Sequence, residues 1–436
     1  PEGMVESCME FLRICVAENF TDVVISIKAS NTVVMVKTVR LLVDVMEKEG
    51  MTFPLHLGVT EAGDGEDGRI KSALGIGALL SDGLGDTIRV SLSEAPEAEI
   101  PVARKLVDYV LLRQDHPYIP GLEAPEFNYL SPERRKTKAV RNIGGEHVPV
   151  VIADRMDGKT EVNPQFTPDY IYAGRALPEQ REEGVEYILD ADVWQGEAGT
   201  WPAFNHAQLP LMGECDAALK FLFIPYMAQT DEVIACLKYH PEVVIISQSN
   251  HPNRLGEHRA LVHQLMTEGL QNPVVFFQHY AEDDAENLQI KSAADMGALI
   301  FDGLCDGIFL FNQGSLSHAV VDATAFGILQ AGRTRTSKTE YISCPGCGRT
   351  LYDLEKTIAR IKAATSHLKG LKIGIMGCIV NGPGEMADAD YGYVGAGRGK
   401  ISLYKGKVCV EKNIPEEEAV ERLLEFIRTD REENQQ

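Results

Sequence analysis

An internal repeat constrains the fold of this chain more than any other feature of its sequence. The segment Ile70 to Ile88 reads IKSALGIGALLSDGLGDTI, and the segment Ile290 to Ile308 reads IKSAADMGALIFDGLCDGI, with 12 identities in 19 positions at an offset of 220 residues. Val23-Val24-Ile25 recurs as Val243-Val244-Ile245 at the same offset. Because a long internal period reports a repeated structural unit, we expect two related units in this chain.

Each unit has the pattern of parallel β/α structure, in which apolar runs of strand length alternate with amphipathic stretches of helix length. In the first copy we predict strands at 23–28, 54–59 and 86–92, with helices at 4–18, 32–49, 69–84 and a last one that ends near 110. In the second copy we predict strands at 148–153, 186–190, 220–225, 243–247, 273–278 and 307–311. A period of 220 residues is about the size of a small eight-stranded barrel, so an α/β chain with two TIM-type (β/α) barrels is expected.

The two copies differ in extent, and a third segment follows them. The first copy ends near Arg113, so we expect it to be the C-terminal part of a barrel whose opening half lies before Pro1. After 333 the sequence turns to short strands at 371–375, 401–404 and 407–410, many glycines and a closing helix at 415–428. We therefore predict three domains: a partial catalytic barrel at 1–115, a second, degenerate barrel inserted at 116–333, and an α+β domain at 334–436.

Composition excludes several classes of protein. No run approaches the ~20 apolar residues that a bilayer crossing needs. The net charge of −22 opposes binding to nucleic acid through the overall field. Nine cysteines in 436 residues are too few for a secreted disulfide scaffold, which favours thiols or thiolate ligands in a reducing compartment.

Three cysteines of the last segment have the pattern of a metal centre. Cys344-Pro-Gly-Cys347 places two thiolates in one turn, and Cys378 follows a predicted strand in the motif GCIVNGPGE. Since no second CxxC and no nearby histidine completes a zinc site, an iron–sulfur cluster with a different fourth ligand is favoured. The nearest candidate is the carboxylate of Glu385, a hard oxygen ligand that a substrate oxygen would displace, as a reactive cluster requires.

The residues alone leave three interpretations: a cluster-dependent reductase, a zinc-stabilised barrel protein without redox activity, and a barrel lyase that carries a redox domain without using it. The first accounts for most of the sequence. It also suits the charge of the last segment, because Cys344 to Lys412 holds eleven Lys and Arg against six Asp and Glu, a local surplus of five. An acidic electron carrier would dock on such a domain, although substrate phosphates would also use the charge.

The first barrel supplies candidate substrate groups where strands end, which is where β/α barrels bind their ligands. Lys28, Arg89 and Ser91 are predicted to hold phosphate, with the last two on one side of one strand, and Glu61 to handle a proton or bind a substrate hydroxyl. At the 220-residue offset Lys28, Arg89 and Ser91 become Gln248, Phe309 and Phe311, so we interpret the second barrel as a structural spacer. Its histidines at 251, 258 and 263 are interpreted as surface helix residues rather than a metal site.

The motifs CPGCGRT and GCIVNGPGE resemble those of 4-hydroxy-3-methylbut-2-enyl diphosphate synthases of the non-mevalonate isoprenoid pathway. The stretches ISIKAS, PLHLGVTEAG and IKSALGIGALLSDGLGDTIRVSLS are similar to that family's barrel, and the middle insert resembles its three-domain form in plants and some bacteria. The resemblance implies a small-molecule substrate, 2-C-methyl-D-erythritol 2,4-cyclodiphosphate, which is reductively opened with loss of a hydroxyl by two electrons from ferredoxin or flavodoxin.

The resemblance also implies the site residues and their setting. A [4Fe-4S] cluster would be held by Cys344, Cys347, Cys378 and Glu385, with Asn381 as a substrate contact. The phosphate-binding arginines that the family keeps nearer its N-terminus do not fall in this sequence. The implied location is the bacterial cytoplasm, or a plastid stroma in a plant, with the cytoplasm favoured. A homodimer is left open.

Overall fold

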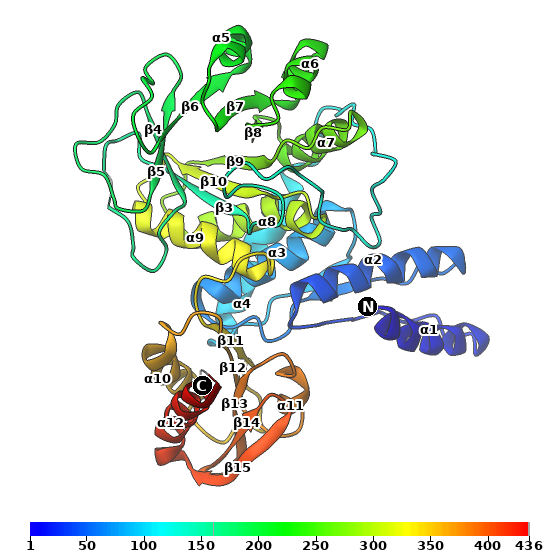
Figure 1. Cartoon of the computed structure of the whole chain (residues 1–436). Coiled ribbons are helices and arrows are strands. Elements are labelled where there is room, and N and C mark those ends of the chain that lie inside the picture. The colour runs from blue at the N-terminus through cyan, green and yellow to red at the C-terminus, as the bar shows by residue number, and fades with distance from the viewer. Residues whose placement is uncertain (160, 435–436) are drawn as a thin grey trace. The chain divides into compact units, whose positions relative to one another are not determined.

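A computed structural model describes residues 1–159 and 161–434 and gives a mixed α/β chain, as expected (Figure 1). The chain divides into two compact units: Pro1–Lys105 together with Thr336–Gln436, called unit 1 here, and Leu106–Arg335, called unit 2. The finer division into three domains at 115 and 333 stays a prediction. In the described part of the chain, no helix has the length and apolar character that crossing a membrane requires.

Unit 2 contains a closed barrel of eight parallel strands in the order β10-β3-β4-β5-β6-β7-β8-β9. This confirms the second barrel. The strands are β3 (Val150–Asp154), β4 (Tyr170–Gly174), β5 (Glu186–Asp190), β6 (Thr200–Asn205), β7 (Lys220–Pro225), β8 (Val243–Gln248), β9 (Val274–Tyr280) and β10 (Gly307–Asn312). Alternate side chains such as Ile152, Tyr170, Phe221 and Val244 fill the interior, so the barrel is a packed core rather than a pore.

The helices of unit 2 follow the strands. They are α5 (Leu209–Glu214), α6 (Asp231–Tyr239), α7 (Arg254–Thr267), α8 (Ala285–Phe301) and α9 (His318–Ala331), with short 3-10 turns η2 (His206–Gln208) and η3 (Tyr226–Ala228). The prediction that His251, His258 and His263 are surface residues is wrong for the two that lie on α7, His258 and His263. His258 is fully buried and its Nδ1 lies 2.7 Å from Ser247 Oγ, while Nδ1 of the buried His263 accepts a hydrogen bond from the Ala124 amide. Both buried imidazoles therefore form polar contacts with other residues of unit 2.

The N-terminal segment of unit 1 carries the other copy of the repeat. Its elements are α1 (Glu2–Ala17), α2 (Thr32–Lys48), β1 (His56–Gly58), α3 (Gly65–Ser81), β2 (Thr87–Arg89), the 3-10 turn η1 (Pro96–Ala98) and the beginning of α4 (Glu99–Leu111). β1 and β2 pair in parallel. No continuous strand forms at 23–28. Isolated parallel bridges join Ile25 to Leu55 and Ala29 to Val59 instead.

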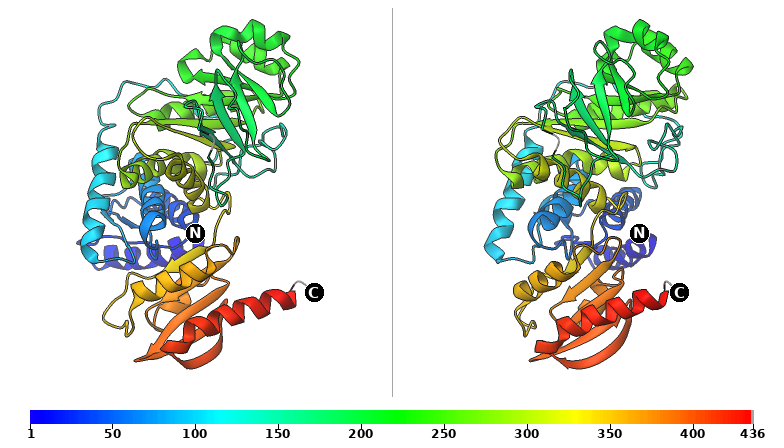
Figure 2. Two further views of the ribbon diagram at one scale, coloured as in Figure 1. Left: turned by 90° about the vertical axis from the view of Figure 1, so that its left-hand side faces the viewer. Right: turned by 60° about the vertical axis from the view of Figure 1, so that its left-hand side comes forward.

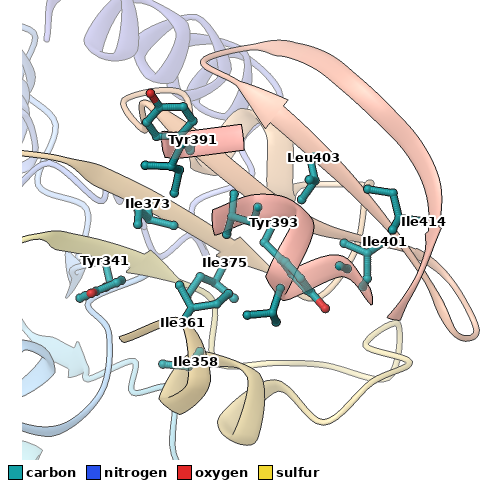
Figure 3. Packing of buried hydrophobic residues seen from close by; sticks show 14 of the residues in the cluster. Tyr341, Ile358, Ile361, Ile373, Ile375, Tyr391, Tyr393, Ile401, Leu403 and Ile414 are labelled. Carbon is teal, nitrogen blue, oxygen red and sulfur yellow. The ribbon is translucent and has the colours of Figure 1, made fainter. Parts of the chain in front are cut away.

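The C-terminal segment of unit 1 is a five-stranded sheet in the order β11-β12-β13-β14-β15. The first three strands are parallel and the last three antiparallel: β11 (Glu340–Ser343), β12 (Lys372–Met376), β13 (Tyr391–Gly397), β14 (Lys400–Lys405) and β15 (Val408–Pro415). Helices α10 (Leu354–Thr365) and α12 (Glu416–Asn434) lie side by side on one face (Figure 2). Ile358 and Ile361 of α10 pack there against Ile373 and Ile375 of β12 (Figure 3).

The two segments of unit 1 pack on each other. Ala62, just after β1, forms a parallel bridge with Ser343 at the end of β11, and Ser93 Oγ lies 2.8 Å from Ser343 Oγ. Nearly buried Lys71 on α3 donates to Glu340 at 3.1 Å. The barrel segment and the cysteine-bearing segment are therefore joined by backbone pairing and buried polar contacts within one chain.

Candidate active site

Two of the three cysteines lie just after the C-terminal ends of neighbouring parallel strands. Cys344 directly follows β11 and Cys378 comes two residues after β12, and these strands are parallel neighbours with Ser343 opposite Ile375. The amide of Gly377 donates to Cys344 Sγ at 3.2 Å, a contact typical of a sulfur that carries negative charge. The sheet thus brings together two thiols that are 34 positions apart in the sequence.

Glycine makes this close packing possible. A Cβ on Gly377 would lie 2.2 Å from Thr350 Oγ1, and a Cβ on Gly395 would lie 2.3 Å from the Gly377 carbonyl oxygen. Thr350 in turn closes the Cys347 turn, since its amide donates to the Cys347 carbonyl at 2.9 Å and its hydroxyl accepts from the Cys347 amide at 3.2 Å. The loop that carries the CGRT motif therefore packs directly against the loop that carries the MGC motif.

Arg349 lies between the two more accessible cysteines. Its side chain is exposed, and hydrogen bonding and charge from Cys378 and Cys347 raise the pKa of its guanidinium. Burial raises the pKa of the Cys378 thiol, but hydrogen bonds from the Val380 and Asn381 amides and from Arg349 more than offset it, so the pKa falls below its ordinary value. Burial raises the pKa of Cys344. The three thiols share one neighbourhood with different electrostatic surroundings.

Glu385 belongs to the same neighbourhood. It ends the single-turn helix α11 (Gly382–Glu385), which begins after exposed Asn381, and its amide donates to the Asn381 carbonyl at 3.0 Å. The negative charge of Glu385 acts on Cys344 and raises the pKa of that thiol further. Ser30, from the barrel segment, donates to the Glu385 carbonyl oxygen at 3.5 Å. Glu385 therefore lies near both the cysteine loops and the barrel segment.

Glu61 is the buried acid of this site. Only 3% of the residue is exposed, its backbone is in the left-handed region at φ 49°, and Oε2 has no hydrogen-bond partner among the described residues. Burial, together with the charge of Glu385 and a hydrogen bond to it, raises the pKa of Glu61 to about 7. Strained backbone and a perturbed carboxyl at one position are a signature of functional sites. At neutral pH this carboxyl can both hold and release a proton.

Basic side chains gather around Gly58. A Cβ on Gly58 would lie 2.9 Å from Cε and 3.1 Å from Nζ of Lys28, so the glycine makes room for this ammonium group, and Gly58 pairs with Arg89 across the ladder. Burial and the charge of Arg89 lower the pKa of Lys28, while burial and the charges of Lys28 and Arg89 lower that of His56. Mutual repulsion among three basic groups is the pattern of an anion site.

The sequence prediction for these residues was incomplete. His56 was missed, although its alternation with Gly58 on one strand places both on the same face. β2 ends at Arg89, so Ser91 lies beyond the strand, and the expectation that the two side chains share one side stays a prediction. Arg89 is exposed and Ser91 is buried, so the two side chains differ in their access to solvent.

Three thiols and one carboxylate are donor types that an iron–sulfur cluster can use. Within residues 1–159 and 161–434, no three His, Cys, Asp or Glu side chains converge tightly enough to hold one metal ion. A four-iron cluster binds each ligand to a different iron, so its ligands lie farther apart than the four around one zinc. Three thiols on adjoining loops, a backbone amide aimed at one sulfur and a carboxylate beside them suit the larger group.

Comparison with known proteins gives consistent matches over both segments of unit 1. Residues 1–104 match the family model described as the GcpE TIM-barrel domain, and residues 340–429 match the GcpE protein C-terminal domain. A 4-hydroxy-3-methylbut-2-en-1-yl diphosphate synthase (flavodoxin) of Bacteroides thetaiotaomicron is 95% identical over 433 residues, which are 99% of this chain and 71% of the relative.

More distant relatives carry the same name. The Bacteroides fragilis protein is 84% identical over 428 residues, covering 98% of this chain and 68% of the relative. The Parabacteroides distasonis protein is 60% identical over 428 residues, covering 98% of this chain and 70% of the relative. The similarity therefore includes unit 2 as well as the two segments matched by the family models.

Proposed function

Because the chain belongs to the family of 4-hydroxy-3-methylbut-2-en-1-yl diphosphate synthases, we propose that it is an oxidoreductase that converts 2-C-methyl-D-erythritol 2,4-cyclodiphosphate to 4-hydroxy-3-methylbut-2-enyl diphosphate. The reaction consumes two electrons and one proton, breaks the ring bond between carbon and a phosphate oxygen, and releases a hydroxyl as water. The single observation that supports it most is the juxtaposition of Glu61 with Glu385, beside Cys344, in one unit of one chain.

The cofactor is proposed to be a [4Fe-4S] cluster held by Cys344, Cys347, Cys378 and Glu385. When bound, the cluster would supply the electron transfer to the substrate. Support comes from the Gly377 amide that donates to Cys344 and from Arg349 beside the other two sulfurs. Donors and cations of this kind stabilise negative charge on thiolates.

The basic group around Gly58 is proposed to bind the diphosphate. Lys28 and Arg89 provide two cations, and His56 provides a ring nitrogen beside them. Ser91 is proposed to add a hydroxyl donor, and Asn381 to contact the substrate from the loop before α11. Since the charges of Lys28 and Arg89 repel each other, a bound phosphate relieves that repulsion and gains affinity from it.

Glu61 is proposed to supply the proton that leaves with the hydroxyl. A carboxyl with a pKa of about 7 is half protonated at neutral pH, which is the condition for efficient proton transfer. Its burial keeps water away from the group, and its position next to Glu385 puts it at the junction of the barrel segment and the cysteine loops. Glu385 would hold the cluster through a carboxylate oxygen, a harder and more readily exchanged ligand than the three thiolates.

Flavodoxin or ferredoxin is proposed as the electron donor, and the names of the relatives specify flavodoxin. Exposed apolar side chains lie next to the cysteines, with Leu351 48% exposed, Ile379 51% and Val380 64%. Exposed Arg349 adds a positive charge in the middle of this group. An acidic carrier that docks here would come close to Cys347 and Cys378, as electron transfer requires. Rising salt should then slow reduction by the carrier but not by dithionite.

The relatives are bacterial, and the cytoplasm is the proposed location. Whether the chain is active as a homodimer with shared sites is tested by mixing two inactive variants.

The decisive experiment is an anaerobic absorption spectrum combined with turnover. We expect a brown protein with a broad band near ~400 nm from sulfur-to-iron charge transfer, and turnover that requires reductant. Cys347→Ser should lose both the band and the activity, whereas Cys409→Ser on β15 should keep both. A colourless protein that binds zinc, or a Cys347→Ser chain that turns over without reductant, would contradict the proposal.

A further inference from the structure

The mouth of the unit 2 barrel is a cavity that the proposed reaction does not use. It has a volume of about 490 Å³ and lies where the parallel strands end, with at least one lining residue on, or just after, each of the eight strands. Five phenylalanines contribute to its wall: Phe204, Phe223, Phe277, Phe309 and Phe311. In β/α barrels this is the end at which ligands bind.

The repeat shows how this mouth differs from the basic group of unit 1. Gly58 pairs with Arg89 in unit 1, and in unit 2 the matching ladder positions are Phe277 and Phe309. The glycine that makes room for Lys28 is therefore replaced by a phenyl ring. Lys28 itself corresponds to Gln248, which also lines the cavity. The basic character of the site has been removed while the opening has been kept.

Aromatic rings dominate the wall. Phe277 packs edge-on against Phe309 with ring centroids 5.0 Å apart and stacks on Phe311 at 5.9 Å. Tyr172 approaches Phe309 at 5.8 Å and Phe223 at 5.5 Å. Phe277, Phe309 and Phe311 belong to the adjacent strands β9 and β10, whereas Tyr172 of β4 and Phe223 of β7 come from strands that do not neighbour each other. Because the rings support one another, they form a rigid aromatic wall.

The charge of the rim is negative. Asp190 and Asp192 line the cavity, and the lining includes one basic side chain, Arg175, which lies 2.8 Å from Asp192 and 4.0 Å from Asp190. Tyr172 donates to Asp190 at 2.6 Å. Burial raises the pKa of Tyr172, and the charges of Asp190, Asp154 and Asp192 raise it further. A phosphate would be repelled here, whereas a positive charge would be attracted.

We propose that the mouth of the unit 2 barrel binds a small organic cation in which an amine or quaternary ammonium group is attached to an apolar body. Aromatic rings attract a cation through their π faces, carboxylates at the rim add Coulomb attraction, and the apolar wall takes the rest of the ligand. The second barrel is then a binding module as well as a spacer. This inference does not depend on the proposed reductase activity.

The test is an NMR titration of the full chain with benzyltrimethylammonium as the probe. We expect saturable binding that Asp190→Asn and Phe311→Leu each weaken by about tenfold, since the first removes a charge and the second replaces a ring by an aliphatic group of similar size. Tyr172 can still donate to the amide oxygen of Asp190→Asn, which limits disturbance of the wall. Benzyl alcohol, which is neutral, should bind at least about tenfold more weakly than the probe.

The control is Glu268→Gln, which removes an exposed carboxylate that follows α7, at the end of the barrel opposite the cavity. Both tryptophans of the chain, Trp194 and Trp201, belong to unit 2, so their fluorescence reports whether each variant still folds. The proposal is overturned if the folded chain shows no saturable binding of the probe. It is equally overturned if benzyl alcohol binds as well as the cation, or if Glu268→Gln weakens binding as much as Asp190→Asn.

Discussion

At the scale of single residues, the site depends on two positions where a side chain is either absent or unusually placed. Gly58 provides space for Lys28, and Glu61 occupies a left-handed backbone with a buried carboxyl. The end of a predicted strand marks Glu61 as a candidate in the sequence, but the space left by Gly58 and the burial of Glu61 depend on neighbours across the ladder and across the junction with the cysteine loops. Each gives a test that separates binding from chemistry.

Gly58→Ala should weaken substrate binding. The added methyl group would lie 2.9 Å from Lys28 Cε and 3.0 Å from the Arg89 carbonyl oxygen, so the ammonium group must move. Losing one charge-assisted contact to phosphate should raise KM by about tenfold or more, with a smaller effect on kcat. Steady-state kinetics measures this. Gly3→Ala, with nothing within 4 Å of the new methyl group, is the matched control and should leave KM unchanged.

Glu61→Gln should slow the chemistry instead. The amide keeps the shape of the side chain but cannot give up a proton, so kcat should fall by about a hundredfold or more. The absorption of the cluster should stay as in the parent chain, because Glu61 is not a proposed ligand. A variant that keeps its full kcat, or that loses the cluster band, would show that Glu61 has another role.

At the scale of elements, the helices of the first copy and six strands of the second barrel were predicted, whereas other strands were missed. The helices at 32–49 and 69–84 were placed within a few residues of α2 and α3. A buried face repeats along α2, whereas α3 is buried on all sides from Ile70 to Leu79. β6 was missed because it contains Pro202, a residue that is uncommon inside a strand, and β4 was missed although its length matches that of predicted β5. β13 was missed because three glycines interrupt its pattern, and Gly395 is needed where the Gly377 carbonyl approaches.

The candidate site shows the same limit. The cysteines and Glu385 were recognisable because short motifs hold them together in the sequence. The wall of the second barrel mouth and the burial of His258 depend on neighbours that are distant in sequence, so no local pattern could reveal them. The α7 sequence has little amphipathic contrast because polar His258 and Glu257 are themselves buried.

Buried His258 makes the stability of unit 2 dependent on pH. Burial and the charge of Arg254 lower its pKa from 6.5 to about 3, so the unfolded chain takes up a proton between pH 6.5 and 3 that the folded chain does not. Its contribution to stability is complete above pH 6.5 and is lost as the pH falls, at about 1.4 kcal/mol per pH unit. Urea unfolding followed by tryptophan fluorescence at pH 5 and 7.5 measures this, since both tryptophans lie in unit 2.

His258→Asn is the matched variant for that measurement. Its amide can keep the contact with Ser247, which lies 2.7 Å from His258 Nδ1, but it does not titrate. The variant should be less stable at pH 7.5 because it leaves space beside Phe276, yet it should lose less stability between pH 7.5 and 5 than the parent chain. Equal losses for both chains would mean that other groups cause the pH dependence.

At the scale of the whole molecule, the arrangement of unit 1 predicts that each chain builds its own active site. Ser30 donates a hydrogen bond to Glu385, Glu61 interacts electrostatically with Glu385, and Ser93 contacts Ser343 next to Cys344, all within one chain.

Mixing a Glu61→Ala chain with a Cys347→Ser chain should therefore restore no activity, since every site lacks one essential group. A site shared across a dimer would instead recover about a quarter of the parent activity, because half of the dimers would carry one complete site. Turnover of the co-expressed mixture, compared with each variant alone and with parent chain diluted by Cys347→Ser chain, distinguishes these outcomes. Recovery in the mixture would mean that the contacts seen within one chain are made between chains in the active enzyme.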